Sequence, residues 1–227
     1  MAELTPLKVV CRLKRSVVLD ARWPLMFDGL LAAVAVRRIK GREFDAEDLT
    51  APGAAIIEPV LPLGRTERDG EWWWQASAAR LSGTETELEW VHSHIDLERL
   101  ERQVADPPAI REQVGRYRSV RLPVPASVCG TLEWDCVGDR TEIEEMLAEV
   151  RSVGKRRGTG HGSVTAWEIT DVTDPHAGHG EWTPHGNPAR PMPPTVGWEG
   201  TTGIAPLRAP YWLPGAGVEV MTPSSRA

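Results

Sequence analysis

The sequence has no apolar run of the roughly 20 residues that a membrane-spanning helix needs. The longest candidate, residues 25–36, is interrupted by Asp28. Residues 1–4 show no basic segment that leads into an apolar stretch, so no signal peptide is expected. These absences predict a cytoplasmic protein that has no membrane partner.

Cysteine is also scarce, and its spacing is not that of a metal site. The three cysteines are Cys11, Cys129 and Cys136, and a sparse, odd-numbered set is typical of buried thiols in a cytosolic chain. His92 and His94 share one face of an expected strand, but no third ligand is evident beside them. We therefore expect no metal site and no cofactor.

The formal net charge of −6 argues against a protein that coats nucleic acid with its whole surface. The basic residues are nevertheless unevenly distributed. Arg151, Lys155, Arg156 and Arg157 all fall within one short segment. A looser basic stretch is formed by Arg99, Arg102, Arg111, Arg116, Arg118 and Arg121. Because the acidic residues lie mostly elsewhere, one face of the protein can bind a polyanion while the chain stays acidic.

Residues 154–162 form a basic glycine-rich segment, Gly-Lys-Arg-Arg-Gly-Thr-Gly-His-Gly. Glycine permits positive φ and close approach to a ligand, and the exposed amides of such turns form an anion-binding nest. Lys155, Arg156 and Arg157 add full charges for phosphates. The segment predicts a loop that holds an RNA backbone. A solvated basic turn is the alternative, whereas nucleotide-binding glycine loops are excluded because these glycines follow an expected helix.

Periodicity and turn residues predict the secondary structure. Strands are expected at residues 8–13, 54–60, 71–78, 84–95, 127–137 and 163–170. Helices are expected at residues 25–38, with Gly41 as a stop, and at 140–152, with Asp139 as the N-cap. Residues 80–83 suit a hairpin connection between the strands on either side.

These elements indicate an α+β protein with a mainly antiparallel sheet. A helix, a glycine loop and a final strand form the second half of a ferredoxin-like (RRM-like) unit, whose first half is residues 8–38. We expect one such domain at residues 1–172, with inserted hairpins. Residues 173–227 are rich in proline and tryptophan, and we expect an irregular tail that wraps the domain. Its expected anchors are Trp182, Trp198 and Trp212.

Three segments resemble a known family. Residues 154–164 resemble the G-rich loop of the RAMP (repeat-associated mysterious protein) superfamily of CRISPR systems. Residues 24–32, Pro-Leu-Met-Phe-Asp-Gly-Leu-Leu-Ala, are similar to the opening of the first helix in the small RAMP subunit of type IV systems. Residues 209–214, Ala-Pro-Tyr-Trp-Leu-Pro, look like the closing motif of that subunit. The three matches together span most of the chain.

The resemblance implies a non-catalytic subunit of a ribonucleoprotein complex. Such a subunit binds the 5′ end of guide RNA, caps a filament of repeated backbone RAMP subunits and contacts the large effector subunit. Lys155, Arg156 and Arg157 would then contact phosphates, and Gly158, Gly160 and Gly162 would permit close approach. Arg151 and His161 complete the expected RNA-binding set. His161 would stack on or hydrogen bond to RNA, or face solvent.

Two other functions stay open. Some RAMP relatives are metal-independent endoribonucleases that cleave precursor RNA with a histidine as general acid or base, usually one in the first half of the domain. Residues 1–90 contain no histidine, so cleavage by His161 would need an unusual arrangement. The remaining alternative is a ferredoxin-like RNA-binding module outside CRISPR systems.

Residues 72–74 are three consecutive tryptophans. Alternation along a strand puts Trp72 and Trp74 on one face and Trp73 on the other. We expect two of them to fill the core and one to meet a partner subunit, with stacking on RNA bases as the alternative. Asp28, on a buried helix, is expected to cap that helix or to pair with an arginine.

Overall fold

The computed structural model describes residues 3–20, 24–41, 57–83, 85–93, 102, 120–173, 179–211, 213 and 215–223. Its elements are, in chain order, β1 (Thr5–Leu13), α1 (Phe27–Lys40), β2 (Arg65–Arg68), β3 (Glu71–Trp74), β4 (Arg80–Leu81), β5 (Glu85–Ser93), β6 (Val120–Val128), β7 (Thr131–Gly138), α4 (Arg140–Ala148), the short 3-10 helix η2 (Arg157–Thr159), β8 (Val164–Asp171), β9 (Thr202–Ala205) and β10 (Val218–Met221). All strand pairings between them are antiparallel, which confirms the α+β prediction.

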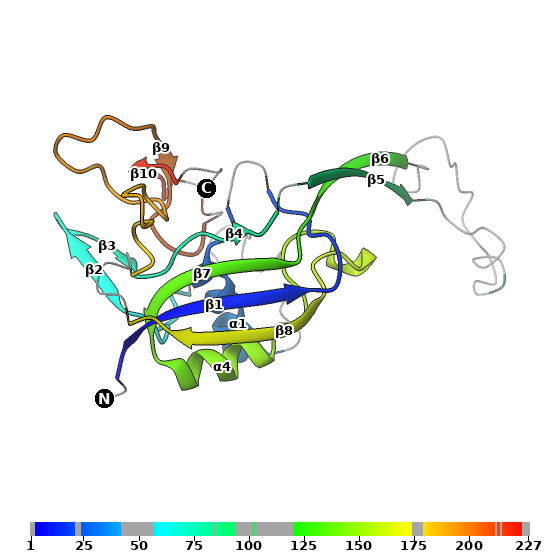
Figure 1. Ribbon diagram of the computed structural model, residues 1–227, viewed down its shortest axis with the longest axis horizontal. Coiled ribbons are helices and arrows are strands. Elements are labelled where there is room, and N and C mark those ends of the chain that lie inside the picture. The colour runs from blue at the N-terminus through cyan, green and yellow to red at the C-terminus, as the bar shows by residue number, and fades with distance from the viewer. Residues whose placement is uncertain are drawn as a thin grey trace.

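The centre of the molecule is a sheet with the strand order β4-β7-β1-β8. Helices α1 and α4 both lie on one side of this sheet (Figure 1). Side chains alternate along β1, so Leu7, Val9 and Cys11 are buried under the helices. Trp134 and Cys136 do the same on β7. The main core therefore lies between one face of the sheet and the two helices.

The cysteines are buried free thiols, as the sequence predicts. Burial raises the pKa of the Cys11 thiol to about 12, with a smaller contribution from Cys129. Burial also raises the pKa values of Cys129 and Cys136. These thiols therefore stay protonated and act as small apolar side chains.

Helix boundaries follow local signals. Helix α1 ends where Gly41 takes a φ of 79° and donates its N–H to the Arg37 carbonyl. At the start of α4, the Asp139 side chain accepts from the Glu142 N–H at 3.0 Å, which confirms the expected N-cap. Helix α4 stops at Ala148, before the expected residue 152, because the chain beyond it is drawn into a bridge between Ser152 and Ser163.

Strand pairing differs from the sequence expectation in one region. The predicted hairpin between residues 71–78 and 84–95 is wrong, because β3 pairs with β2 and β5 pairs with β6. Asp69 and Gly70, with φ of 55° and 83°, form the tight turn that joins β2 to β3. Residues 57–60 form no strand, and 54–56 lie outside the described residues. The strand expected at 127–137 begins only at Thr131, after the turn that follows β6.

The three tryptophans of β3 are buried to different degrees. Trp72 and Trp74 do share a face, and their rings meet edge to face at 5.2 Å. Trp73 is fully buried in a second small core, and Trp74 is partly buried against the main core. Two of the three therefore pack on core residues, as expected. Trp72 instead lies against the guanidinium groups of Arg65 and Arg208, at 4.2 and 4.1 Å from its ring centre.

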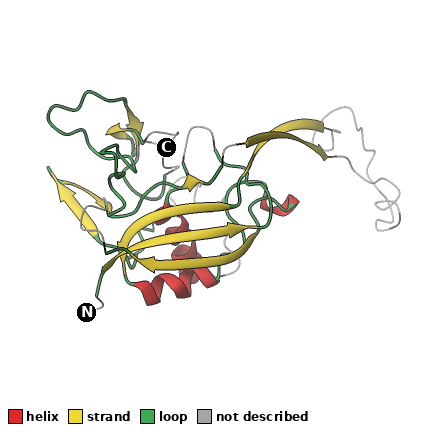
Figure 2. Cartoon of the chain, in the orientation of Figure 1, coloured by secondary structure: helices red, strands yellow, loops and turns green. Residues whose placement is uncertain are grey.

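The tail contains regular structure, contrary to expectation. Strands β9 and β10 pair and pack with Trp73 in a second small core (Figure 2). Trp182 and Trp198 lie partly buried against this core, as two of the three expected anchors. Trp212 lies outside the described residues. In the described part of the chain, no helix has the length and apolar character to cross a membrane.

Candidate nucleic-acid interface

The glycine-rich loop lies against the end of β1. Antiparallel pairing of β1 with β8 brings the residues after β1 beside those before β8. The Lys14 N–H donates to the Ser163 carbonyl at 2.9 Å, and the Gly162 N–H donates to the Ser16 carbonyl at 2.9 Å. The Lys155 N–H donates to the Val18 carbonyl at 2.7 Å. Residues 14–18 and the loop therefore form one continuous surface.

The loop is closed at its neck and shaped at its tip. At the neck, the Val153 N–H donates to the Gly162 carbonyl at 2.9 Å. At the tip, Arg156 adopts a left-handed conformation with φ of 58° and is followed by η2. A left-handed residue next to helical ones turns successive N–H groups to the same side, which is the geometry of an anion-binding nest. In the described part of the chain, the N–H groups of Arg156, Arg157 and Gly158 have no acceptor.

The glycines of the loop divide into two kinds. A Cβ added at Gly158 or Gly160 would meet no atom within 4 Å, so these positions are open to a ligand. A Cβ at Gly162 would lie 1.9 Å from the Val153 carbonyl oxygen, and φ there is 64°. Gly162 is thus buried at the neck and required by the fold. Of these three glycines, only Gly158 and Gly160 allow a ligand to approach the backbone closely.

Exposed cations surround the loop. Arg151, Arg156 and Arg157 are exposed, and their side chains have no hydrogen bond or ion pair with any described residue. Lys155 is paired with the Asp20 carboxylate. An arginine with no internal partner keeps all of its N–H donors available for phosphate oxygens. The structure therefore brings together the basic side chains that the sequence singled out.

Lys14 and Arg15 belong to the same surface, although sequence reasoning did not include them. Both are exposed, and neither side chain pairs with a described residue. A signal for them was present in the sequence. If the first and last strands of the expected unit pair in antiparallel fashion, the residues after the first strand must lie beside the glycine loop.

His161 is buried under the loop, so the alternative in which it faces solvent is wrong. Only 5% of its surface is exposed. Its Nδ1 lies 3.3 Å from the Ser16 Oγ, and its Nε2 lies 3.3 Å from a carboxylate oxygen of Glu89 in β5. The Ser16 hydroxyl also donates to Glu89 at 2.9 Å. This cluster ties the loop, the segment after β1 and the hairpin β5–β6 together.

A second buried polar cluster lies between α1 and the tail. Asp28 and Arg190 are both fully buried, with 3.6 Å between a carboxylate oxygen and Nη2, which confirms the expected arginine partner. The Tyr211 hydroxyl donates to Asp28 at 2.7 Å and lies 3.2 Å from Arg190. Burial raises the pKa of Asp28, while Arg190 and Tyr211 act to lower it. The Asp28 motif and the closing motif thus meet in space, away from the glycine loop.

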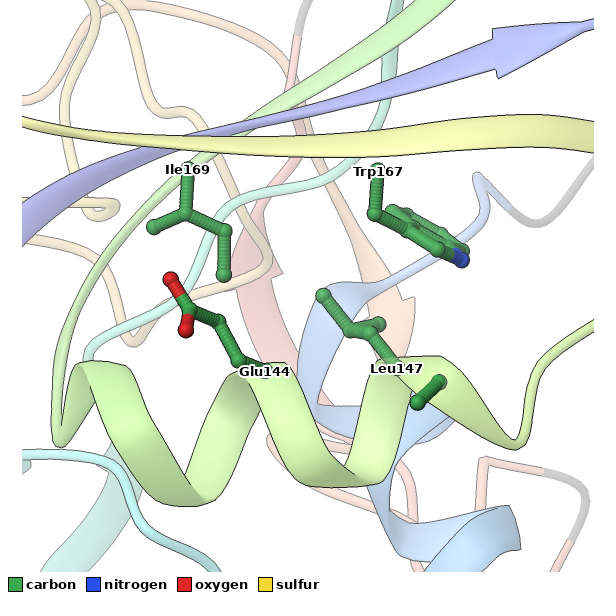
Figure 3. A pocket seen from close by; sticks show the side chains of 5 residues that line it. Glu144, Leu147, Trp167 and Ile169 are labelled. Atoms are coloured by element: carbon green, nitrogen blue, oxygen red, sulfur yellow. The ribbon is translucent and has the colours of Figure 1, made fainter.

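A shallow groove of about 240 Å³ lies between α4 and β8 (Figure 3). Its walls are formed by Glu144, Leu147, Ala148, Trp167 and Ile169. None of these residues belongs to the cationic surface. The groove is therefore separate from the candidate nucleic-acid interface.

Comparison with protein families identifies the family of this chain. A family model described as CRISPR type IV associated protein Csf3 matches residues 5–104 and 108–223. The chain belongs to the Csf3 family. This membership confirms the resemblance to a RAMP-like subunit of type IV CRISPR systems. A search of curated proteins finds no match. The match to the Csf3 family includes the first-helix motif, the glycine loop and the closing motif.

Proposed function

We propose that this chain is a non-catalytic RNA-binding subunit of a type IV CRISPR ribonucleoprotein, which binds the 5′ end of guide RNA through its glycine loop. One observation carries the proposal. Arg156 and Arg157, which have no partner among the described residues, flank open glycines and a set of unpaired backbone N–H groups. Lys14, Arg15 and Arg151 extend the positive charge on either side. Phosphate groups are the ligands that this combination suits best.

We assign the central domain to the ferredoxin-like class. The support is topological: the chain order β1-α1-β4-β7-α4-β8 and the sheet order β4-β7-β1-β8 are those of a βαββαβ unit. The glycine loop then occupies the connection between the second helix and the last strand.

Repeated backbone subunits and the large effector subunit are the protein partners in this proposal. The hairpin β5–β6 extends away from the sheet and helices (Figure 1). It exposes Leu88, Trp90 and Leu122, at 59%, 48% and 46% of their surfaces. Apolar side chains grouped on a projecting ribbon support a contact with another subunit.

A metal-independent endoribonuclease is the second candidate. The observation in its favour is that His161 lies beneath the cationic loop and next to the Glu89 carboxylate, as a general acid or base would. Against it, both ring nitrogens are already directed at Ser16 and Glu89, and the ring is buried.

The direct test is binding of fluorescently labelled guide RNA by the full chain, followed by anisotropy over a range of salt concentrations. Arg156→Glu combined with Arg157→Glu should weaken RNA binding about tenfold or more. The slope of log affinity against log salt concentration should also fall by about two, because two phosphate contacts are lost. The control is Arg37→Glu with Lys40→Glu, which makes the same charge change at the end of α1. If both variants lost the same RNA affinity, the effect would come from the overall charge of the protein and not from the loop, which would contradict the proposal.

A further inference from the structure

The central sheet has one long edge strand. Strand β8 ends the order β4-β7-β1-β8 and runs over Val164–Asp171, whereas the opposite edge strand, β4, spans only Arg80–Leu81. Thr165, Ala166 and Thr170 of β8 are exposed. A long uncovered edge strand presents unpaired backbone groups that can accept another strand.

The backbone groups on this edge can be assigned from one side-chain contact. The Ile169 carbonyl accepts from Arg140 Nη2 at 2.9 Å, so this carbonyl points away from β1. Backbone direction alternates along an antiparallel strand, and Trp167 and Asp171 therefore also direct their N–H and carbonyl groups outward. These groups form no strand pairing with any other described residue.

The groove between α4 and β8 runs directly beside that edge. Trp167 and Ile169 point from β8 toward α4, where Leu147 faces them (Figure 3). An extended segment paired with β8 would direct every second side chain toward α4. An apolar side chain at such a position would enter the groove, so edge and groove together form one site for an extended chain.

The other long ribbon of the molecule contrasts with this edge. Strand β6 carries Pro123 and Pro125, which face Trp90 and Leu88 on β5. Proline has no N–H, so both residues must lie where the β6 backbone faces outward, and they prevent strand addition there. Strand β8 contains no proline. Among the described strands, the prolines block the outer edge of β6, whereas β8, like β5, carries no proline.

Charge identifies the occupant. Within Arg140–Glu149, helix α4 and its C-cap carry one arginine against four glutamates, Glu142, Glu144, Glu145 and Glu149. Arg140 is already held by Glu144 and Asp171, and Glu149 is paired with Arg38. The exposed Glu142 and Glu145 are left without a cation among the described residues. A basic segment is therefore attracted to this groove. RNA is repelled, and a second copy of this chain would place like charges together.

We propose that the edge of β8 and the adjoining groove bind an extended, lysine- or arginine-containing segment of another protein, which adds to the sheet as a fifth strand. Backbone hydrogen bonds to the outward N–H and carbonyl groups of Trp167 and Asp171 hold the segment, because Arg140 already occupies the Ile169 carbonyl. An apolar side chain fills the space next to Ala148, and basic side chains face the glutamates of α4. This site is independent of the RNA-binding proposal.

The probe is a short, capped, fluorescein-labelled peptide that carries lysines and valines at every second position and threonine between them, so that lysines and valines share the face toward α4. It is titrated with the full chain and followed by anisotropy. One control peptide has glutamate in place of lysine, and another has N-methylated valines. Ala148→Arg places a cation in the groove and should weaken binding of the lysine peptide by about tenfold or more. Glu145→Lys should weaken it several-fold. Neither substitution should weaken RNA binding, because both lie outside the cationic surface and add positive charge.

Several results would overturn the proposal. They are equal binding of the glutamate peptide, equal binding of the N-methylated peptide, or unchanged binding by Ala148→Arg. A dimer in light scattering that Ala148→Arg converts to monomer would assign the edge to a second copy instead. Loss of RNA affinity in Ala148→Arg would assign the groove to RNA. Ala148→Gln fills the groove without charge, and binding equal to that of Ala148→Arg would remove charge complementarity from the proposal.

Discussion

The Tyr211 hydroxyl lies 2.8 and 2.7 Å from the two carboxylate oxygens of Asp28, and so joins the tail to the first turn of α1. The neighbouring Gly29 has a matching role, because a Cβ there would lie 3.2 Å from the Tyr211 ring. The Asp-Gly pair of one motif and the tyrosine of another thus form a single contact. Both motifs therefore contribute to the fold.

Removal of that hydroxyl should destabilise the protein. Tyr211→Phe leaves the ring in place but deprives buried Asp28 of a donor, which costs about 1–3 kcal/mol of unfolding free energy. Urea unfolding measures the loss. Thr170→Val, which removes an exposed hydroxyl on β8, should change the free energy by less than about 0.5 kcal/mol. A Tyr211→Phe variant as stable as the wild type would show that Arg190 alone satisfies Asp28.

The same cluster predicts a pH dependence. Because burial raises the pKa of Asp28, the folded state binds this proton more tightly than the unfolded state does. The contribution of Asp28 to stability is therefore fully present below its unfolded pKa of about 4 and is lost as pH rises through the folded value. The unfolding free energy of the wild type, relative to Asp28→Asn, should rise as pH falls from about 7. Urea titrations at a series of pH values measure it, and a falling difference would refute it.

The tail should be essential to the central domain. A chain that ends at residue 172 loses Arg190 and Tyr211 and exposes Trp73. We expect it to lose its cooperative unfolding transition, because an uncompensated buried carboxylate costs several kcal/mol. A chain that ends at residue 223 keeps β10 and should unfold like the wild type. Circular dichroism during heating distinguishes the two, and a cooperative transition in the shorter chain would make residues 1–172 a domain that folds alone.

Lys14 and Arg15 should contribute to RNA affinity although they are distant in sequence from the glycine loop. Lys14→Glu with Arg15→Glu should weaken guide RNA binding about tenfold, because each lost phosphate contact reduces the counterions released on binding. Anisotropy at several salt concentrations measures the affinity and the salt slope. The Arg37→Glu, Lys40→Glu variant is again the control. An unchanged salt slope would place the RNA on the other side of the loop.

His161 distinguishes the two proposed functions. His161→Ala removes the contacts with Ser16 and Glu89 and should lower RNA affinity several-fold by loosening the loop. We expect neither the wild type nor the variant to cut repeat-containing RNA in the presence of a chelator. Gel analysis of the incubated RNA measures cleavage. Cutting by the wild type that His161→Ala abolishes would favour the endoribonuclease.

Local signals in the sequence are sufficient to predict α1, β1, β8 and the start of α4, but not the end of α4. The Asp139 cap and the Gly41 stop each depend on chain neighbours, and both predictions are confirmed. Pairing between distant segments was harder to predict. The β2–β3 hairpin has a local signal, the Asp69-Gly70 turn, but residues 80–83 also suit a hairpin turn and indicated a different partner for residues 71–78.

The sequence predicts the charge of the candidate site but not which of its residues are buried. The exposed arginines follow from composition, because a cluster of cations without acidic neighbours must face water. Burial of His161 could not be foreseen, since it depends on where Ser16 and Glu89 of β5 come to lie. Ser16, Glu89 and His161 are far apart in the sequence, so no local spacing predicts that they meet. Lys14 and Arg15 are an intermediate case. The strand order of the expected unit is enough to predict that they lie beside the glycine loop.

The Asp28–Tyr211 contact also bears on the order in which the protein can form during synthesis. A ribosome releases α1 long before residues 190–211 have been polymerised. Until then Asp28 has neither Arg190 nor Tyr211 beside it, and its carboxylate must remain hydrated. The first turn of α1 therefore cannot take its final buried place on the nascent chain. Completion of the core has to wait for the tail to emerge.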